Sequence, residues 1–169
     1  MGVMVFGKLP TYGDFVVRGM SADDRALLDQ WLSNGMIEAR AVLGDSFEDR
    51  YDRAPPWRFA AGDSGGVLVP SVDRAGRRFP VYLMRVGITP SEAVGAAEAC
   101  EELIYKAFAE AWDVDELVAN AAALTFRQAE LVDRARWWTA SGEGFPLAER
   151  VGAQPNDLLA AMLAMEEDA

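Results

Sequence analysis

The sequence predicts an α/β fold, a three-layer α/β/α sandwich whose mixed sheet contains a β-hairpin. Short apolar segments alternate with helical patterns in the order strand, helix, three strands, helices, strand, helix. Each helical pattern carries one apolar stripe, and helices on both sides of one sheet would bury all of these stripes. Two of the strand segments are joined by about five turn-forming residues, and this hairpin makes the sheet mixed rather than purely parallel.

The N-terminal part begins with an expected buried strand at residues 3–6, followed by a loop rich in Gly and Pro at residues 7–15. Ser21 then offers a helix N-cap, with Asp24 three residues later in the capping-box position. Apolar residues recur at helical spacing after this cap, so one face of the helix should pack inward. Gly44 suits the end of the helix.

The middle of the chain is expected to be rich in strands. A short polar helix is expected over residues 45–53, before a pair of prolines. Strands are then expected at residues 57–60, 66–72 and 79–86. The last two strands would form the hairpin, with the polar segment 73–77 at its tip.

The second half is rich in alanine and is expected to be mainly helical. Residues 89–92 predict a helix start, with Thr as N-cap, Pro in the first turn and Glu closing a capping box. A shorter helix is expected over residues 113–124, a late strand over residues 136–140 and a C-terminal helix from about residue 155. The length of 169 residues suits a single domain spanning residues 1–169.

The composition excludes several classes of function. The net charge is −11 and the pI about 4.4, which argues against non-specific nucleic-acid binding. The sequence has no histidine, so a Ser-His-Asp triad and a histidine-based zinc site are impossible. The single cysteine, Cys100, allows no internal disulfide and suits a reducing compartment. Because no apolar run approaches the roughly 20 residues of a membrane span and the start lacks the features of a signal peptide, we expect a cytoplasmic protein without direct membrane insertion.

Two segments invite chemical interpretations. Gly7-Lys8 and Gly13-Asp14 suggest a phosphate loop, but the spacing is wrong, and Pro10 cannot donate a main-chain N–H. Ser71 with Lys8 could make a Ser-Lys dyad, although Ser71 is more simply explained as a strand-end residue.

Asp14 and Asp73 could form a magnesium site if the fold brings them together. Their neighbours Arg18, Arg74 and Arg77 instead favour salt bridges and loop-internal hydrogen bonds. We therefore expect no catalytic site, no metal and no cofactor.

The tryptophans are expected to lie in the core, with each indole N–H seeking a partner. Trp137 and Trp138 are neighbours in an expected strand, where adjacent side chains point to opposite faces. At most one of them can share a given core layer, and the other should pack under a helix or form a surface patch.

Several stretches together resemble the N-terminal domain of the TagF (ImpM) family, which is associated with type VI secretion. They are Phe6-Gly7-Lys8-Leu9-Pro10, Gly13-Asp14-Phe15, Arg18, Pro56-Trp57-Arg58-Phe59, Gly66-Val67-Leu68-Val69-Pro70-Ser71-Val72-Asp73-Arg74, Gly76-Arg77, Phe79-Pro80 and Trp137-Trp138-Thr139. The resemblance spans most of the chain with the stretches in the right order. It implies a three-layer α/β fold and a post-translational regulator that restrains assembly or firing of a type VI secretion system. It also implies a protein partner, a forkhead-associated scaffold protein, and it supplies no catalytic residues.

The expected function is therefore that of a non-enzymatic accessory protein that acts by protein binding. The alternatives are a carboxylate-based enzyme that could use magnesium and a structural subunit of the secretion apparatus. The candidate partner-binding or motif residues are Gly7, Lys8, Pro10, Gly13, Asp14, Arg18, Trp57, Arg58, Ser71, Asp73, Arg74, Gly76 and Arg77. We expect the two Gly-, Pro- and charge-rich segments to lie together at one end of the sheet, either as a docking surface or only as turns that shape the fold.

Overall fold

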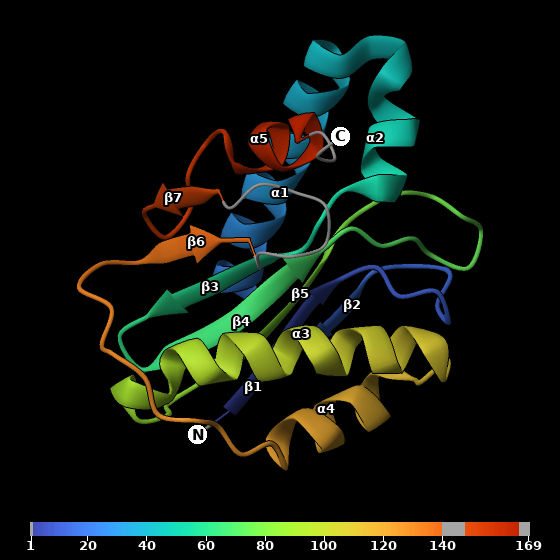
Figure 1. Cartoon of the computed structure of the whole chain (residues 1–169). Coiled ribbons are helices and arrows are strands. Elements are labelled where there is room, and N and C mark those ends of the chain that lie inside the picture. The colour runs from blue at the N-terminus through green and yellow to red at the C-terminus, as the bar shows by residue number, and fades with distance from the viewer. Residues whose placement is uncertain (1, 140–147, 166–169) are drawn as a thin grey trace.

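The computed structural model describes residues 2–139 and 148–165, which form one sheet flanked by helices. The strands are β1 (Gly2–Gly7), β2 (Val16–Arg18), β3 (Trp57–Ala61), β4 (Ser64–Val69), β5 (Val81–Val86), β6 (Arg136–Trp138) and β7 (Glu149–Val151). They lie in the order β2-β1-β5-β4-β3-β6-β7 (Figure 1). Because β1 lies between β2 and β5, the N-terminal strand is an internal strand of the sheet.

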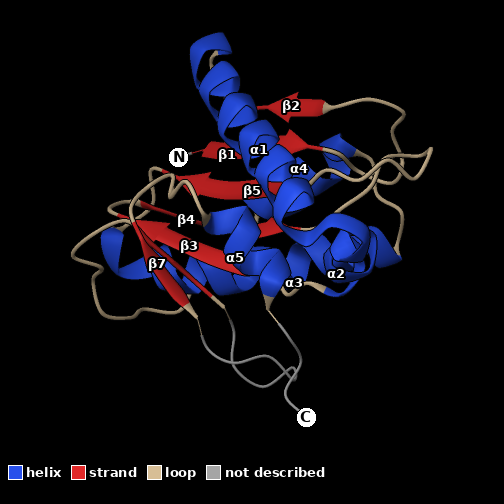
Figure 2. Ribbon diagram, turned by 90° about the horizontal axis from the view of Figure 1, so that it is seen from above, coloured by secondary structure: helices blue, strands red, loops and turns tan. Residues whose placement is uncertain are grey.

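Helices cover both faces of this sheet. One face carries α1 (Ala22–Leu43), α2 (Phe47–Arg53) and α5 (Leu158–Ala164), and the other carries α3 (Ala93–Ala109) and α4 (Val114–Ala122) (Figure 1). Seen from above, α1 and α5 lie over the strands (Figure 2). The α/β class predicted from the sequence is therefore confirmed. Among the described helices, none combines the length and the apolarity that crossing a membrane requires.

The expectation of a mixed sheet is wrong, because every strand pair in the described residues is antiparallel. The reason lies in the connections. A short turn joins β3 to β4 and the loop 70–80 joins β4 to β5, and such hairpin connections give antiparallel neighbours. The long helical connections join strands that are not neighbours in the sheet, so they create no parallel pair.

The expected hairpin between β4 and β5 is confirmed, and an isolated bridge between Val72 and Arg78 extends it. A second hairpin, between β3 and β4, was not expected. It turns at Gly62, whose φ of +52° favours glycine. Strands β2 and β7 were also missed, because each has only three residues. The expected late strand is observed as β6, and its predicted end at residue 140 lies outside the described residues.

The helix starts follow the expected caps. The Ser21 hydroxyl accepts a hydrogen bond from the Asp24 amide at 3.1 Å. The capping box between Thr89 and Glu92 is present, one turn before α3. The C-terminal helix begins at Leu158, three residues after the expected start.

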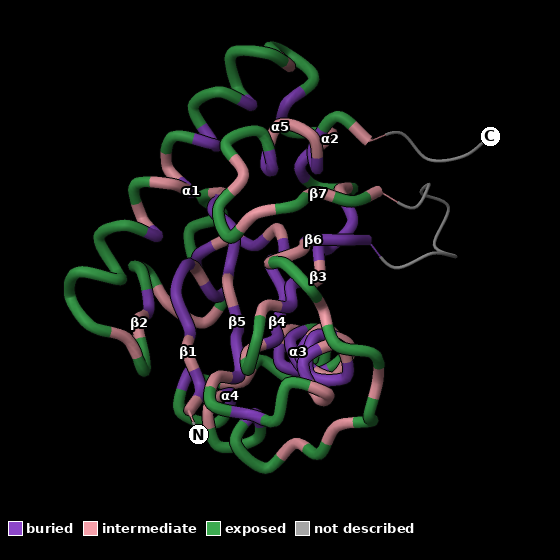
Figure 3. Tube along the Cα trace, turned by 90° about the vertical axis from the view of Figure 1, so that its left-hand side faces the viewer, coloured by how far each residue is buried: buried purple, intermediate pink, exposed green. Residues whose placement is uncertain are grey.

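The core has a separate apolar cluster on each face of the sheet. Buried positions gather along β1, β5 and β4 (Figure 3). Trp57 and Trp137 belong to the cluster under α1 and α5, whereas Trp138 packs with alanines of α3 on the other face. The expected division of the two neighbouring tryptophans is therefore confirmed. Cys100 is buried on the α3 side, and burial raises the pKa of its thiol to about 12.

Candidate functional site

The structure brings the two Gly-, Pro- and charge-rich segments together at one end of the sheet. We call residues 7–15 and 70–80 the loop cluster. The Lys8 amide donates to the Pro80 carbonyl at 3.4 Å, and the Arg74 amide donates to the Tyr12 carbonyl at 2.7 Å. The expected proximity of the segments is thus confirmed.

Asp73 lies at the centre of the loop cluster and is only 2% exposed. One carboxylate oxygen, Oδ1, accepts from the amides of Ala75 at 2.9 Å and Arg77 at 3.0 Å. The other, Oδ2, accepts from Arg77 Nε at 2.7 Å and pairs with Lys8 Nζ at 3.2 Å. Burial alone would raise the pKa of this carboxyl, but the bonds from Arg77 and Lys8 lower the pKa to about 2. Asp73 is therefore an ionised, fully partnered group that fixes the turn.

Two arginines of the hairpin connection tie it to the preceding loop. Arg74 Nη2 donates to the Thr11 carbonyl at 2.8 Å, and Arg77 Nη2 donates to the Gly13 carbonyl at 2.7 Å. Both arginines are nevertheless exposed to solvent. They can therefore shape the loop cluster and present positive charge at the same time. Gly76 suits the tip because its φ is +82°.

Ser71 is bonded to the main chain and not to a base. Its hydroxyl donates to the Lys8 carbonyl at 2.7 Å, while the Lys8 ammonium pairs with Asp73. The buried Tyr51 hydroxyl accepts from the Ser71 amide at 2.9 Å and donates to the Ser71 carbonyl at 2.7 Å. Burial raises the pKa of Tyr51 far above its usual value. This arrangement matches the strand-end interpretation of Ser71 and not a Ser-Lys dyad.

Asp14 and Arg18 do not pair with each other, contrary to their spacing in the sequence. The exposed Asp14 accepts from the Phe15 amide at 2.7 Å. Arg18 Nε donates to Asp115 Oδ1 at 3.1 Å, because β2 pairs with β1 and places Arg18 beside α4. Within residues 2–139 and 148–165, no group of three or more His, Cys, Asp or Glu side chains gathers in a way that could hold a metal ion.

Two candidates, Trp57 and Arg58, lie on β3 and outside the loop cluster as defined. Trp57 is fully buried, and its indole nitrogen has no hydrogen-bond partner among the described residues. Arg58 forms a two-point ion pair with Glu101 of α3, with distances of 3.2 and 3.0 Å. Arg58 therefore helps to attach α3 to the sheet, whereas Trp57 fills the apolar cluster under α1 and α5 on the opposite face.

The sequence argument did not single out the aromatic side chains of this region. Phe15 is 38% exposed, stacks on Phe6 and meets Phe79 edge-to-face, and Lys8 Nζ lies 5.1 Å from its ring centroid. The Tyr12 hydroxyl accepts from the first amide of α4. Phe15 belongs to one of the stretches that resemble the family, but only the fold shows that its ring reaches the surface.

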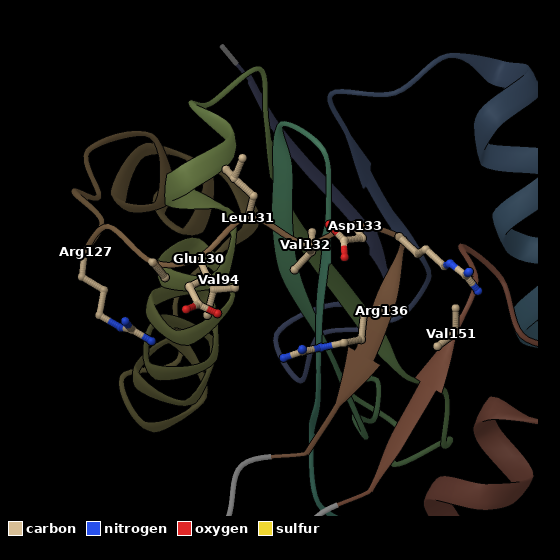
Figure 4. Close-up of a pocket in the computed structure, with 10 residues that line it drawn as sticks. Val94, Arg127, Glu130, Leu131, Val132, Asp133, Arg136 and Val151 are labelled. Atoms are coloured by element: carbon tan, nitrogen blue, oxygen red, sulfur yellow. The ribbon is translucent and has the colours of Figure 1, made fainter.

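A cavity of about 830 Å³ lies elsewhere, between the start of α3 and strands β6 and β7. In Figure 4, Val94, Arg127 and Glu130 lie on the α3 side, and Arg136 and Val151 lie on the strand side. Two of the charged groups have contacts: Arg127 forms a two-point ion pair with Glu98, and Arg136 Cζ lies 4.5 Å from the Trp138 ring centroid. The lining offers no nucleophile beside a base.

Comparisons with known proteins give one family match and one similar fold. The model of a family described as the TagF N-terminal domain, type VI secretion system-associated, matches residues 4–124. The fold is similar to the crystal structure of PA0076 from Pseudomonas aeruginosa PAO1, with a TM-score of 0.75 and 23% sequence identity. That match covers 95% of this chain and 93% of the other, and at this identity it bears on the fold alone. No curated protein matches the sequence. The matched residues 4–124 contain the whole loop cluster.

Proposed function

The chain belongs to the family of TagF N-terminal domains associated with type VI secretion, and from this membership we propose that it is a non-enzymatic, cytoplasmic regulator that acts by binding another protein. The proposed partner is a forkhead-associated scaffold protein of the secretion system. Regulation would be post-translational, through occupation of a surface and not through chemistry.

Two observations support a non-enzymatic role. The polar side chains at the centre of the loop cluster hold the fold: Asp73 binds two amides and two cations, and Ser71 bonds to a carbonyl. The sequence also lacks histidine, the most common general base.

The docking surface that we propose is the exposed side of the loop cluster. Phe15 presents a partly exposed ring, and Arg74 and Arg77 present guanidinium groups beside the same loop. Aromatic and arginine side chains are enriched among residues that dominate interface energies. The buried Asp73 network keeps this surface rigid before binding, which lowers the entropic cost of association. In a chain of net charge −11, such a cationic spot suits an acidic or phosphorylated partner surface.

The test is a paired substitution that keeps the internal network. Phe15→Ser with Arg74→Glu removes the exposed ring and reverses one exposed charge, but it leaves Asp73 and Arg77 in place. We expect at least a tenfold loss of affinity for the forkhead-associated protein, measured by calorimetry at two salt concentrations. The matched control is Arg25→Glu with Ile37→Ser on the exposed side of α1, which should leave affinity unchanged.

Three outcomes would count against the proposal. A folded double variant with unchanged affinity and unchanged salt dependence would exclude the loop cluster as the contact. Stable copurification of the protein with the assembled apparatus would favour a structural subunit, and saturable thermal stabilisation by Mg²⁺ would favour the carboxylate-based enzyme.

A further inference from the structure

Arg85 is a charged residue in the interior of the sheet. It lies in β5, opposite Val3 of β1 on one side and Gly65 of β4 on the other. It is 1% exposed. Side chains alternate along a strand, so Arg85 shares the face of Val81 and Leu83, whose cluster packs against α3 and α4.

The guanidinium group of Arg85 has few partners among the described residues. Nη1 donates to the Ala121 carbonyl at 2.6 Å, near the C-terminal end of α4. The Phe126 ring centroid lies 5.1 Å from Cζ. Nε is buried without a hydrogen-bond partner, and no described carboxylate pairs with the group. The negative end of a helix dipole offsets part of the charge, but a buried cation normally has a full counter-ion.

A groove of about 380 Å³ lies between the start of β1, the end of β2 and α4, and Arg85 is among the residues that line it. Its lining consists of Gly2, Val3, Arg18, Gly19, Arg85, Val118 and Ala122. The lining thus contains two arginines and no carboxylate, in a protein of net charge −11. The remaining lining residues are apolar or glycine.

The glycines let main chain form part of the wall. Gly19 has φ +74°, and a Cβ there would lie 1.8 Å from the Val3 carbonyl oxygen. Arg18 is already bound by Asp115 and the Val17 carbonyl, so it adds positive potential at the rim. Among the described residues, no carboxylate pairs with Arg85, so this is the group that could accept an anion.

We propose that this groove binds a small organic carboxylate, with the carboxylate at Arg85 and an apolar stem between Val3 and Val118. A guanidinium matches a carboxylate in shape and charge. The apolar walls favour a singly charged anion with a hydrocarbon part over inorganic phosphate, which is more strongly hydrated. This site is independent of the loop cluster and of the proposed docking function.

The test uses the full chain and short carboxylates as probes. Acetate, propionate and butyrate are titrated at constant ionic strength against chloride, with propionamide as the neutral analogue and inorganic phosphate as the competing anion. The readouts are the ¹⁵N–¹H resonance of Arg85 Nε and the melting temperature, which rises when a ligand binds only the native state.

We expect saturable shifts of the Arg85 resonance and a melting temperature that rises from acetate to butyrate, with no response to propionamide. Arg85→Met should abolish the rise in melting temperature. Ala122→Phe keeps the guanidinium but narrows the groove at an exposed lining position, and it should weaken butyrate binding at least tenfold.

Three results would overturn the proposal. One is the absence of any saturable shift, and another is an equal rise in melting temperature in the wild type and in both variants, which indicates a general salt effect. The third is a response to phosphate that exceeds the response to butyrate, which would replace the carboxylate by an oxyanion without an apolar stem.

Discussion

Asp73 and Arg85 are both buried charges, yet their surroundings differ. Asp73 accepts hydrogen bonds from two amides and pairs with two cations, so each carboxylate oxygen has two partners inside the fold. Arg85 has one carbonyl acceptor and one aromatic face among the described residues, and its Nε has no partner. The buried charge of Asp73 is therefore balanced by partners inside the loop cluster. The buried charge of Arg85, beside α4, has no such balance among the described residues. The comparison separates a buried ion that builds the structure from one that still has binding capacity.

The largest effect is expected from Asp73→Ala. The substitution leaves Lys8, Arg77 and the Ala75 amide without their shared acceptor, and removing one member of a buried ionic network is strongly destabilising. We expect the melting temperature to fall by on the order of 10 °C, measured by circular dichroism. A decrease in melting temperature smaller than about 2 °C would mean that the loop cluster does not depend on Asp73. Asp73 would then not be a buried charge that stabilises the structure.

The contribution of Asp73 to stability should also depend on pH in the wild-type protein. The folded pKa of the Asp73 carboxyl, lowered to about 2, lies below the usual unfolded value of about 3.9. The stability that it supplies is therefore present above pH 4 and is lost as the pH falls toward 2. In urea titrations between pH 4 and pH 2, Asp73→Asn should show a shallower decline in stability than the wild type. Equal slopes would show that other carboxyl groups account for the acid sensitivity.

Tyr51→Phe tests the network one step away from Asp73. The hydroxyl satisfies both the amide and the carbonyl of Ser71 in a buried site. Its removal should lower the free energy of unfolding by about 1–3 kcal/mol, the usual range for leaving buried polar groups unpaired. Urea denaturation measures this loss. Tyr105→Phe is the control, because Tyr105 is 42% exposed and solvent can replace its contacts.

The sequence predicts the secondary structure of the molecule better than it predicts the burial and the partners of the charged side chains. The helical stripes, the caps at Ser21 and Thr89 and the hairpin are local patterns, and they were read correctly. The direction of the sheet depends on which distant strands become neighbours, and β2 and β7 are too short to give a pattern. These features needed the three-dimensional structure.

The candidate site shows the same limit. Asp14 and Asp73 look alike in the sequence, since each lies in a glycine-containing loop with an arginine within four residues, and only the fold shows that one is exposed and the other buried. Arg85 was overlooked, although a signal existed. Alternation along residues 81–86 places it on the same face as Val81 and Leu83, which marks it as an arginine on a buried face.

Arg85→Met should change stability little or improve it. The variant loses one charged hydrogen bond to Ala121, but it also removes the desolvation of an uncompensated cation, so we expect between no change and a gain of about 2 kcal/mol. Arg58→Met on β3 is the matched control. There the partner carboxylate of Glu101 is only 13% exposed and would be left without its cation, so we expect a loss of about 1–3 kcal/mol. The contrary result would be a larger loss of unfolding free energy for Arg85→Met than for Arg58→Met in urea denaturation. Arg85 would then stabilise the packing of α4, as Asp73 stabilises the loop cluster, and the two buried charges would not differ.

The smallest effect is expected from Asp14→Ala, and it tests the comparison most selectively. Asp14 has the same charge as Asp73 and lies in the same loop cluster, but it is exposed and accepts one bond, from the neighbouring Phe15 amide. Arg18, its nearest arginine in the sequence, is bound to Asp115 instead. We therefore expect a loss below about 0.5 kcal/mol, typical of surface substitutions, in the same urea experiment that measures Asp73→Ala. A loss as large as that of Asp73→Ala would mean that position in the loop cluster, and not burial with partners, decides the effect. Unchanged stability with altered affinity for the forkhead-associated protein would place Asp14 on the docking surface, beside Phe15.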